Sequence, residues 1–91
     1  MDVALHLTIS GVVQGVGYRR WVEREADRRG ISGWVRNRDD GTVEAVIAGG
    51  ETAVQAFLAA ARRGPHGAIV STIETAPADM PEPGFRVLRT A

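Results

Sequence analysis

The residues best suited to chemistry lie in one stretch, Gly11-Val12-Val13-Gln14-Gly15-Val16-Gly17-Tyr18-Arg19, between an alternating apolar run and a helical apolar pattern. That position predicts a turn from a strand into a helix. Its three glycines allow a tight bend and a close approach to a bound group. The first amides of a helix lack intrahelical partners and carry the positive end of its dipole. Because Arg19 adds a fork of donors suited to phosphate or carboxylate, the stretch predicts an anion-binding cradle.

Arg19 has an ordinary alternative, which is a surface side chain paired with Glu23 four residues later. A cation in the first turn opposes the helix dipole, at a cost of about 0.3–1 kcal/mol. A bound anion ahead of the helix would offset that cost, and this favours a functional Arg19.

Periodicity divides the chain into six main elements and a short final strand. The expected elements are a strand over 3–10, a helix over 18–29, strands over 31–38 and 42–48, a helix over 51–63, a strand over 68–75 and a short strand from residue 85. Asp39-Asp40-Gly41 predicts the hairpin turn between the second and third strands. In the fourth strand Val70 breaks the parity of Ile69 and Ile73, which a β-bulge would accommodate. A proline-containing connection is expected over 76–84.

This order predicts an α+β fold, a ferredoxin-like α/β sandwich with two helices on one face of an antiparallel sheet. The strand and helix sequence is β-α-β-β-α-β plus the short final strand. No repeat or linker interrupts it, so residues 1–91 are expected to form a single domain.

The composition of the chain argues against several classes of function. Eleven basic and eleven acidic residues balance, whereas a nucleic-acid binder is expected to be basic. The chain has no cysteine and no basic, apolar leader, and its apolar runs are too short to span a bilayer. We expect a cytoplasmic monomer that binds neither nucleic acid nor membrane.

The pattern from Gly11 to Arg19 resembles the first signature of the acylphosphatases. A second signature of that family follows in register, as Gly33-Trp34-Val35-Arg36-Asn37, Gly41-Thr42-Val43 and Gly49. The resemblance extends over essentially all 91 residues and implies the same α/β sandwich. It also implies hydrolysis of an acyl phosphate to a carboxylate and inorganic phosphate, with no metal and no cofactor. Inorganic phosphate or sulfate is expected as a ligand.

The same resemblance makes Arg19 and Asn37 the catalytic residues. Arg19 would bind the phosphoryl group, together with the loop residues Gln14, Gly15, Val16, Gly17 and Tyr18. Asn37 would orient a water molecule, since a neutral amide both donates and accepts hydrogen bonds but cannot take a proton at neutral pH. The alternative for Asn37 is a turn residue bonded to its own backbone.

The sequence leaves details of several side chains open. Gln14 could bond within the loop or to the ligand, and the Tyr18 hydroxyl has no assignment on a helix face that otherwise packs. Trp34 could cover the open face of the sheet or shape the approach of the substrate. His6 and His66 lack metal-ligand partners at suitable spacing.

Competing functions are kept as alternatives. The loop lacks the Lys and Ser or Thr of a nucleotide P-loop and the spacing of the dinucleotide fingerprint. A non-catalytic phosphate- or acyl-phosphate-binding module is the main alternative, and family-like domains occur in larger hydrogenase-maturation proteins. An RNA-binding domain would need stacking aromatics on the sheet, for which Trp34 is the one candidate.

Overall fold

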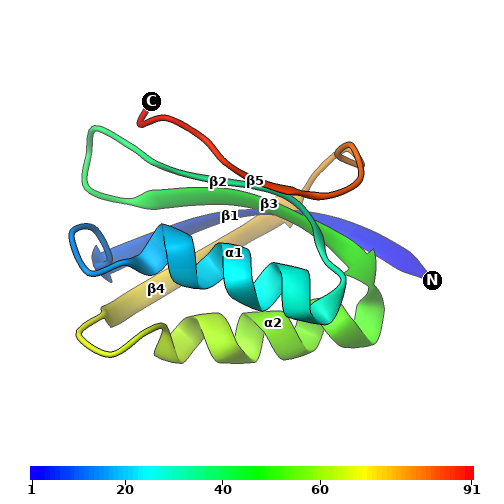
Figure 1. Cartoon of the computed structure of the whole chain (residues 1–91), viewed down its shortest axis with the longest axis horizontal. Coiled ribbons are helices and arrows are strands. Elements are labelled where there is room, and N and C mark those ends of the chain that lie inside the picture. Colours follow the sequence, from blue (N-terminus) through cyan, green and yellow to red (C-terminus); the bar gives the residue numbers. More distant parts are fainter.

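Two helices cover one face of a five-stranded sheet (Figure 1). The computed structural model describes residues 1–91. The elements are β1 (Asp2–Val12), α1 (Tyr18–Arg29), β2 (Ser32–Asn37), β3 (Val43–Gly50), α2 (Glu51–Arg63), β4 (Ile69–Pro77) and β5 (Phe85–Val87). Both helices have the predicted bounds, because their apolar periodicity ends at Gly30 and Gly64. Neither helix is long and apolar enough to cross a membrane.

The strands lie in the order β4-β1-β3-β2-β5, the split β-α-β arrangement of a ferredoxin-like fold. β3 pairs antiparallel with β1 and β2, and β4 pairs antiparallel with β1. The prediction of an antiparallel sheet is right for these four strands. β5 pairs in parallel with β2, which makes the complete sheet mixed. The reason is that residues 78–84 carry the chain from one edge of the sheet to the other.

The strand ends differ from their predicted positions by a few residues. β1 begins at Asp2 and continues to Val12, because Gly11 and Val12 still pair with β4 beyond an irregularity in the register. Ser10 pairs with Thr72 and Gly11 with Val70, so that β4 contains one extra residue. This confirms the predicted bulge. A Cβ at Gly11 would lie 2.1 Å from the carbonyl oxygen of Ile69, so the close approach requires glycine.

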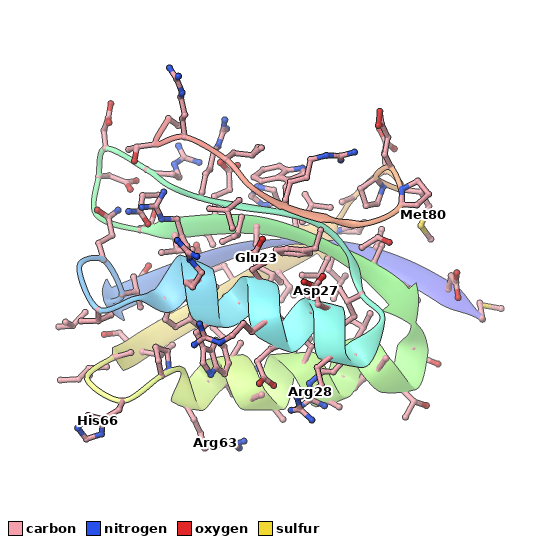
Figure 2. The ribbon with its side chains drawn as sticks, viewed as in Figure 1. Glu23, Asp27, Arg28, Arg63, His66 and Met80 are labelled. Atoms are coloured by element: carbon pink, nitrogen blue, oxygen red, sulfur yellow. The ribbon has the colours of Figure 1, made fainter.

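The core lies between the helices and the inner face of the sheet. Alternation puts Leu7 and Ile9 there, whereas Val3 and Leu5 are only partly buried towards the end of β1. Trp21 of α1 is also partly buried and packs against the core. The fully enclosed helix residues are Tyr18, Val22, Ala26, Val54, Phe57 and Ala61. Charged side chains such as Asp27, Arg28 and Arg63 stay at the surface (Figure 2).

The hydroxyl of Tyr18 caps the end of α2. Pro65 has no backbone N–H, so the carbonyl of Ala61 lacks its usual helical donor. The buried Tyr18 Oη donates to that carbonyl at 2.7 Å. Burial raises the pKa of Tyr18 above its ordinary value, so the phenol remains a donor. The side chain that the sequence left unassigned therefore joins the start of α1 to the end of α2.

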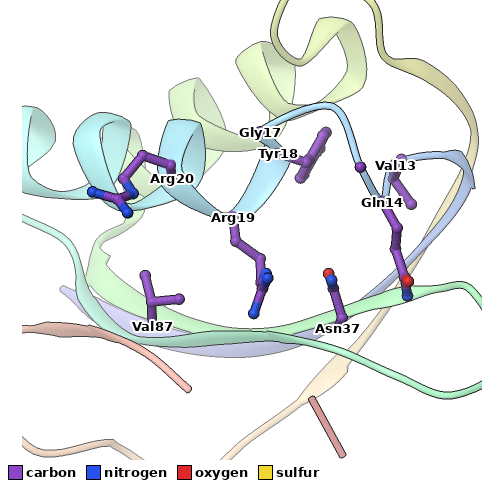
Figure 3. A pocket seen from close by; sticks show the side chains of 9 residues that line it. Val13, Gln14, Gly17, Tyr18, Arg19, Arg20, Asn37 and Val87 are labelled. Carbon is purple, nitrogen blue, oxygen red and sulfur yellow. The ribbon is translucent and has the colours of Figure 1, made fainter. Parts of the chain in front are cut away.

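The loop between β1 and α1 lies beside the end of β2 (Figure 3). This follows from the strand order, since the chain passes β3 on its way from β1 to β2 and α1 packs against β2 and β5. Gly17 precedes Tyr18 at the first turn of α1, and Asn37 is the last residue of β2. Two segments from the two family signatures thus meet at one end of the sheet.

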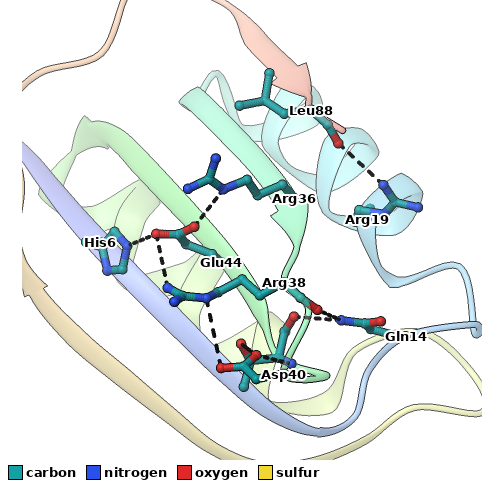
Figure 4. A network of polar contacts seen from close by, with 9 residues as sticks. His6, Gln14, Arg19, Arg36, Arg38, Asp40, Glu44 and Leu88 are labelled. Atoms are coloured by element: carbon teal, nitrogen blue, oxygen red, sulfur yellow. Dashed lines mark hydrogen bonds and ion pairs between the residues drawn. The ribbon is translucent and has the colours of Figure 1, made fainter. Parts of the chain in front are cut away.

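The opposite face of the sheet carries an ion-pair network around Glu44 (Figure 4). Glu44 is only 7% exposed in the central strand β3. Its carboxylate lies 2.7 Å from His6 Nε2, 2.7 Å from Arg36 Nε and 3.6 Å from Arg38 Nη1. Burial acts to raise the pKa of Glu44, but hydrogen bonds from His6 and Arg36 and the Arg36 charge outweigh it. The net result is a pKa below the ordinary value of 4.5.

Replacing Tyr18 with Phe should lower the free energy of unfolding by about 1–3 kcal/mol, since it leaves the carbonyl of Ala61 buried without a donor. Urea denaturation of both proteins measures this difference. Identical midpoints and slopes would show that the hydroxyl does not cap α2.

Glu44→Gln should make the free energy of unfolding depend less steeply on pH in the acid range. Because folding lowers the pKa of Glu44, its contribution is fully present above the unfolded-state value and is lost as pH falls through the folded-state value. Urea midpoints from pH 7 down to about pH 3 should therefore fall more steeply for the wild type than for the variant. Glu74→Gln, on the exposed strand β4, is the matched control and should keep the wild-type slope. Equal slopes for all three proteins would contradict the role of Glu44.

Candidate active site

A pocket of about 540 Å³ opens between the β1–α1 loop, the start of α1 and the ends of β2 and β5 (Figure 3). Its lining residues are Val13, Gln14, Gly15, Gly17, Tyr18, Arg19, Arg20, Asn37 and Val87. Arg19 and Asn37, which are 18 residues apart in the chain, therefore share one cavity. No carboxylate or imidazole lines it, and two arginines give it a positive charge in a chain of zero net charge.

The loop has the backbone geometry of an anion cradle. Gly15 and Gly17 adopt left-handed φ angles of 76° and 77°, which glycine reaches without strain. The amides of residues 14–17 donate to no other protein group. No side chain caps α1, and no acidic residue lies in its first turn. A Cβ at either glycine would meet no protein atom within 4 Å, so the bend faces open space. Free amides around such a bend favour an anion.

Arg19 has no carboxylate partner, and the alternative of an ion pair with Glu23 is wrong. Its guanidinium instead donates one hydrogen bond, from Nη1 to the carbonyl of Leu88, at 3.4 Å. Figure 3 shows the side chain directed from α1 into the pocket. Most donors of the guanidinium are therefore available to a ligand.

Asn37 lines the same pocket, and its side chain carries an acceptor with no protein partner. Its Oδ1 is buried and accepts no hydrogen bond from the protein. Its backbone is held on both sides, because it pairs with Val43 of β3 and its carbonyl accepts from the amide of Ala91 at 2.9 Å. Buried acceptors without a partner are uncommon and call for an explanation. The turn-residue alternative supplies none, since this side chain makes no bond to its own turn.

Gln14 connects the cradle to the turn that follows Asn37 (Figure 4). Its Nε2 donates to the carbonyls of Arg38 at 2.8 Å and Thr42 at 2.9 Å. These carbonyls flank the β2–β3 turn, so the bonds leave the loop rather than closing within it. The distance between cradle and β2 is thus set in part by one side-chain amide.

The side chains of Tyr18 and Val16, two further residues of the predicted phosphate-binding loop, pack in or against the core. The Tyr18 ring packs in the core, and Trp21 lies beside it with ring centres 5.6 Å apart. Val16 does not line the pocket, because its side chain packs against the core, and only its backbone belongs to the cradle.

Trp34 does not shape the pocket. It alternates with Val35 and therefore lies on the opposite face of β2, where the Arg36 guanidinium stacks 5.2 Å from its ring centre. Of the two interpretations left open by the sequence, the structure supports cover of the open sheet face.

Sequence reasoning missed Arg20, Val87 and Leu88. Arg20 directly follows Arg19 in the chain, and a second cation in the first helical turn was a signal that could have been read. Val87 and Leu88 gave no such signal, since their positions depend on the parallel pairing of β5 with β2.

The geometry is suited to binding a tetrahedral anion and to holding a small molecule beside it. Side chains able to act as general acid or base at neutral pH do not line the pocket. No group of three or more His, Asp or Glu residues forms a metal-binding cluster. A reaction here would therefore depend on positioning and on electrostatic stabilisation.

Comparisons with known proteins identify the chain's relatives. A family model described as acylphosphatase matches residues 5–87. An acylphosphatase of Azorhizobium caulinodans is 56% identical over 92 aligned residues, which cover 99% of each chain. The acylphosphatase structure from Bacillus subtilis superposes with a TM-score of 0.89 at 38% identity, covering 97% of this chain and 99% of that one. That from Coxiella burnetii gives 0.90 at 32% identity, covering 96% and 93%.

With a family match across nearly the whole length and close relatives of the same size, the protein is a member of the acylphosphatase family.

Proposed function

We propose that this acylphosphatase holds the phosphoryl group of its substrate in the Gln14–Arg19 cradle while Asn37 orients the attacking water. The family implies a small acyl phosphate as the substrate. The observation that supports this site is the meeting, in one pocket, of free loop amides, the unpaired Arg19 guanidinium and the unused Oδ1 of Asn37.

Phosphoryl binding follows from the charges. The amides of residues 14–17 have no protein acceptor, the uncapped start of α1 lies beside them, and Arg19 adds a full positive charge to the same pocket. A helix N-terminus stabilises an anion by about 0.3–1 kcal/mol at an exposed site, and hydrogen bonds to charged groups contribute about 1.5–3 kcal/mol each. Donors fixed by the backbone keep stabilising the phosphoryl oxygens as their charge redistributes in the transition state.

The proposed attack of water on phosphorus depends on the side-chain acceptor of Asn37. Its Oδ1 takes one hydrogen bond from a water molecule, whose lone pair then faces phosphorus. The new P–O bond forms as the P–O bond to the acyl carboxylate breaks, and the proton of the water passes to solvent. A carboxylate is a stable leaving group, so the reaction needs no general acid. This agrees with a pocket that has none.

Replacing Arg19 with Gln should abolish phosphate binding and turnover, because no other side chain takes over its charge beside the cradle. Asn37→Ala should lower kcat by roughly 100-fold, a size typical of a lost positioning or polar group at an active site. The Asn37 variant should keep its affinity for phosphate within a few-fold. Benzoyl phosphate hydrolysis and calorimetry with inorganic phosphate measure the two effects.

Arg24→Gln is the matched control, because Arg24 is an exposed arginine on α1 that does not line the pocket. It should behave as wild type in both assays. Near-wild-type turnover of both test variants would refute the assignment. Phosphate binding by the wild type without hydrolysis of any acyl phosphate would identify a binding module instead.

Activity should survive exhaustive dialysis against EDTA, since the proposed mechanism uses amides and a guanidinium and takes no step through a metal. The assay compares benzoyl phosphate hydrolysis before and after dialysis, with Mg²⁺ added back to a third sample. A loss that Mg²⁺ restores would contradict the mechanism.

A further inference from the structure

The pocket continues beyond Arg19 to a second arginine. Arg20 lines the same cavity, together with Val87 of β5. Figure 3 shows these two residues on one side of Arg19 and Asn37 on the other. The cradle, at the Asn37 side, accounts for the phosphoryl group, so the Arg20 side is where the acyl part of a substrate would lie.

Arg20 is exposed and forms neither an ion pair nor a hydrogen bond with any protein group. At the far end of the same helix, Arg28 and Arg29 both pair with Glu25, whereas Arg24, one turn from Arg20, has no ion pair and does not line the pocket. The position of Arg20 in the first turn of α1 is unfavourable for a cation. An anionic partner in the pocket would compensate for it.

Arg20 is not placed to share the phosphoryl group with Arg19. Consecutive helical residues are rotated by about 100° around the axis, so their side chains diverge. In Figure 3 the two guanidinium groups point in different directions. A ligand that contacts both must therefore extend from the cradle along the pocket, where Val87, a residue that is 39% exposed, offers an apolar surface.

We propose that Arg20 is a specificity-determining residue that binds a carboxylate on the acyl group, so that the preferred substrates are acyl phosphates with a second, anionic end. A single guanidinium balances one negative charge and matches the planar fork of a carboxylate. Val87 then contacts the carbon skeleton. The inference rests on the proposed function, because it assumes that the phosphoryl group occupies the cradle.

The test compares kcat/KM for benzoyl phosphate and 4-carboxybenzoyl phosphate in the wild type, Arg20→Gln and Arg24→Gln. Arg20→Gln should lower kcat/KM for the carboxylated substrate roughly three- to fivefold, the size of an exposed ion pair, and leave benzoyl phosphate within twofold. The effect should appear mainly in KM and shrink as salt is raised, because the pair is exposed. Arg24→Gln should change neither substrate.

The activity of Arg20→Gln on benzoyl phosphate, which lacks the second carboxylate, separates failure of this inference from failure of the proposed function. An equal loss on both substrates would mean that Arg20 contacts the phosphoryl group, and no loss on either would make it a bystander. Both results overturn the inference and leave the proposed function standing. A wild type that hydrolyses neither substrate would overturn both.

Discussion

The bend at Gly15 and Gly17 is the constraint on which the rest of the site depends. Two left-handed residues turn the chain ahead of the uncapped first turn of α1, where the loop amides donate to no protein group. A side chain at either position would make this conformation costly. The surrounding contacts hold the bend in place from two directions, through Gln14 towards the β2–β3 turn and through Tyr18 towards the end of α2.

The two faces of the sheet serve the site in different ways. On the inner face, Val35 packs in the core and Asn37 reaches the pocket. On the outer face, Glu44 pairs with Arg36 and Arg38, which lie on either side of Asn37 in the chain. Because Gln14 also bonds to the carbonyl of Arg38, the position of Asn37 is fixed by neighbours on both sides. Ion pairs on the outer face thus hold the two residues that flank Asn37, which lines the pocket on the inner face.

Much of this could be predicted from the sequence, because local rules decide it. The two helices follow from apolar periodicity and their glycine ends, and the hairpin at residues 39–41 follows from its turn chemistry. The bulge followed from the break in parity at Val70. Gly15, Gly17 and Arg19 lie within five residues of the chain, so a candidate cradle could be proposed before any long-range contact was known.

Only the tertiary structure showed which residues far apart in the chain contact one another. The parallel pairing of β5 with β2 brings Val87 and the carbonyl of Leu88 to the pocket, and a three-residue strand has too weak a pattern to predict its partner. The bond from Tyr18 to Ala61 and those from Gln14 to residues 38 and 42 join positions 24 to 43 residues apart. Local sequence sets backbone conformation, whereas the direction and the partner of a side chain depend on which elements pack beside it.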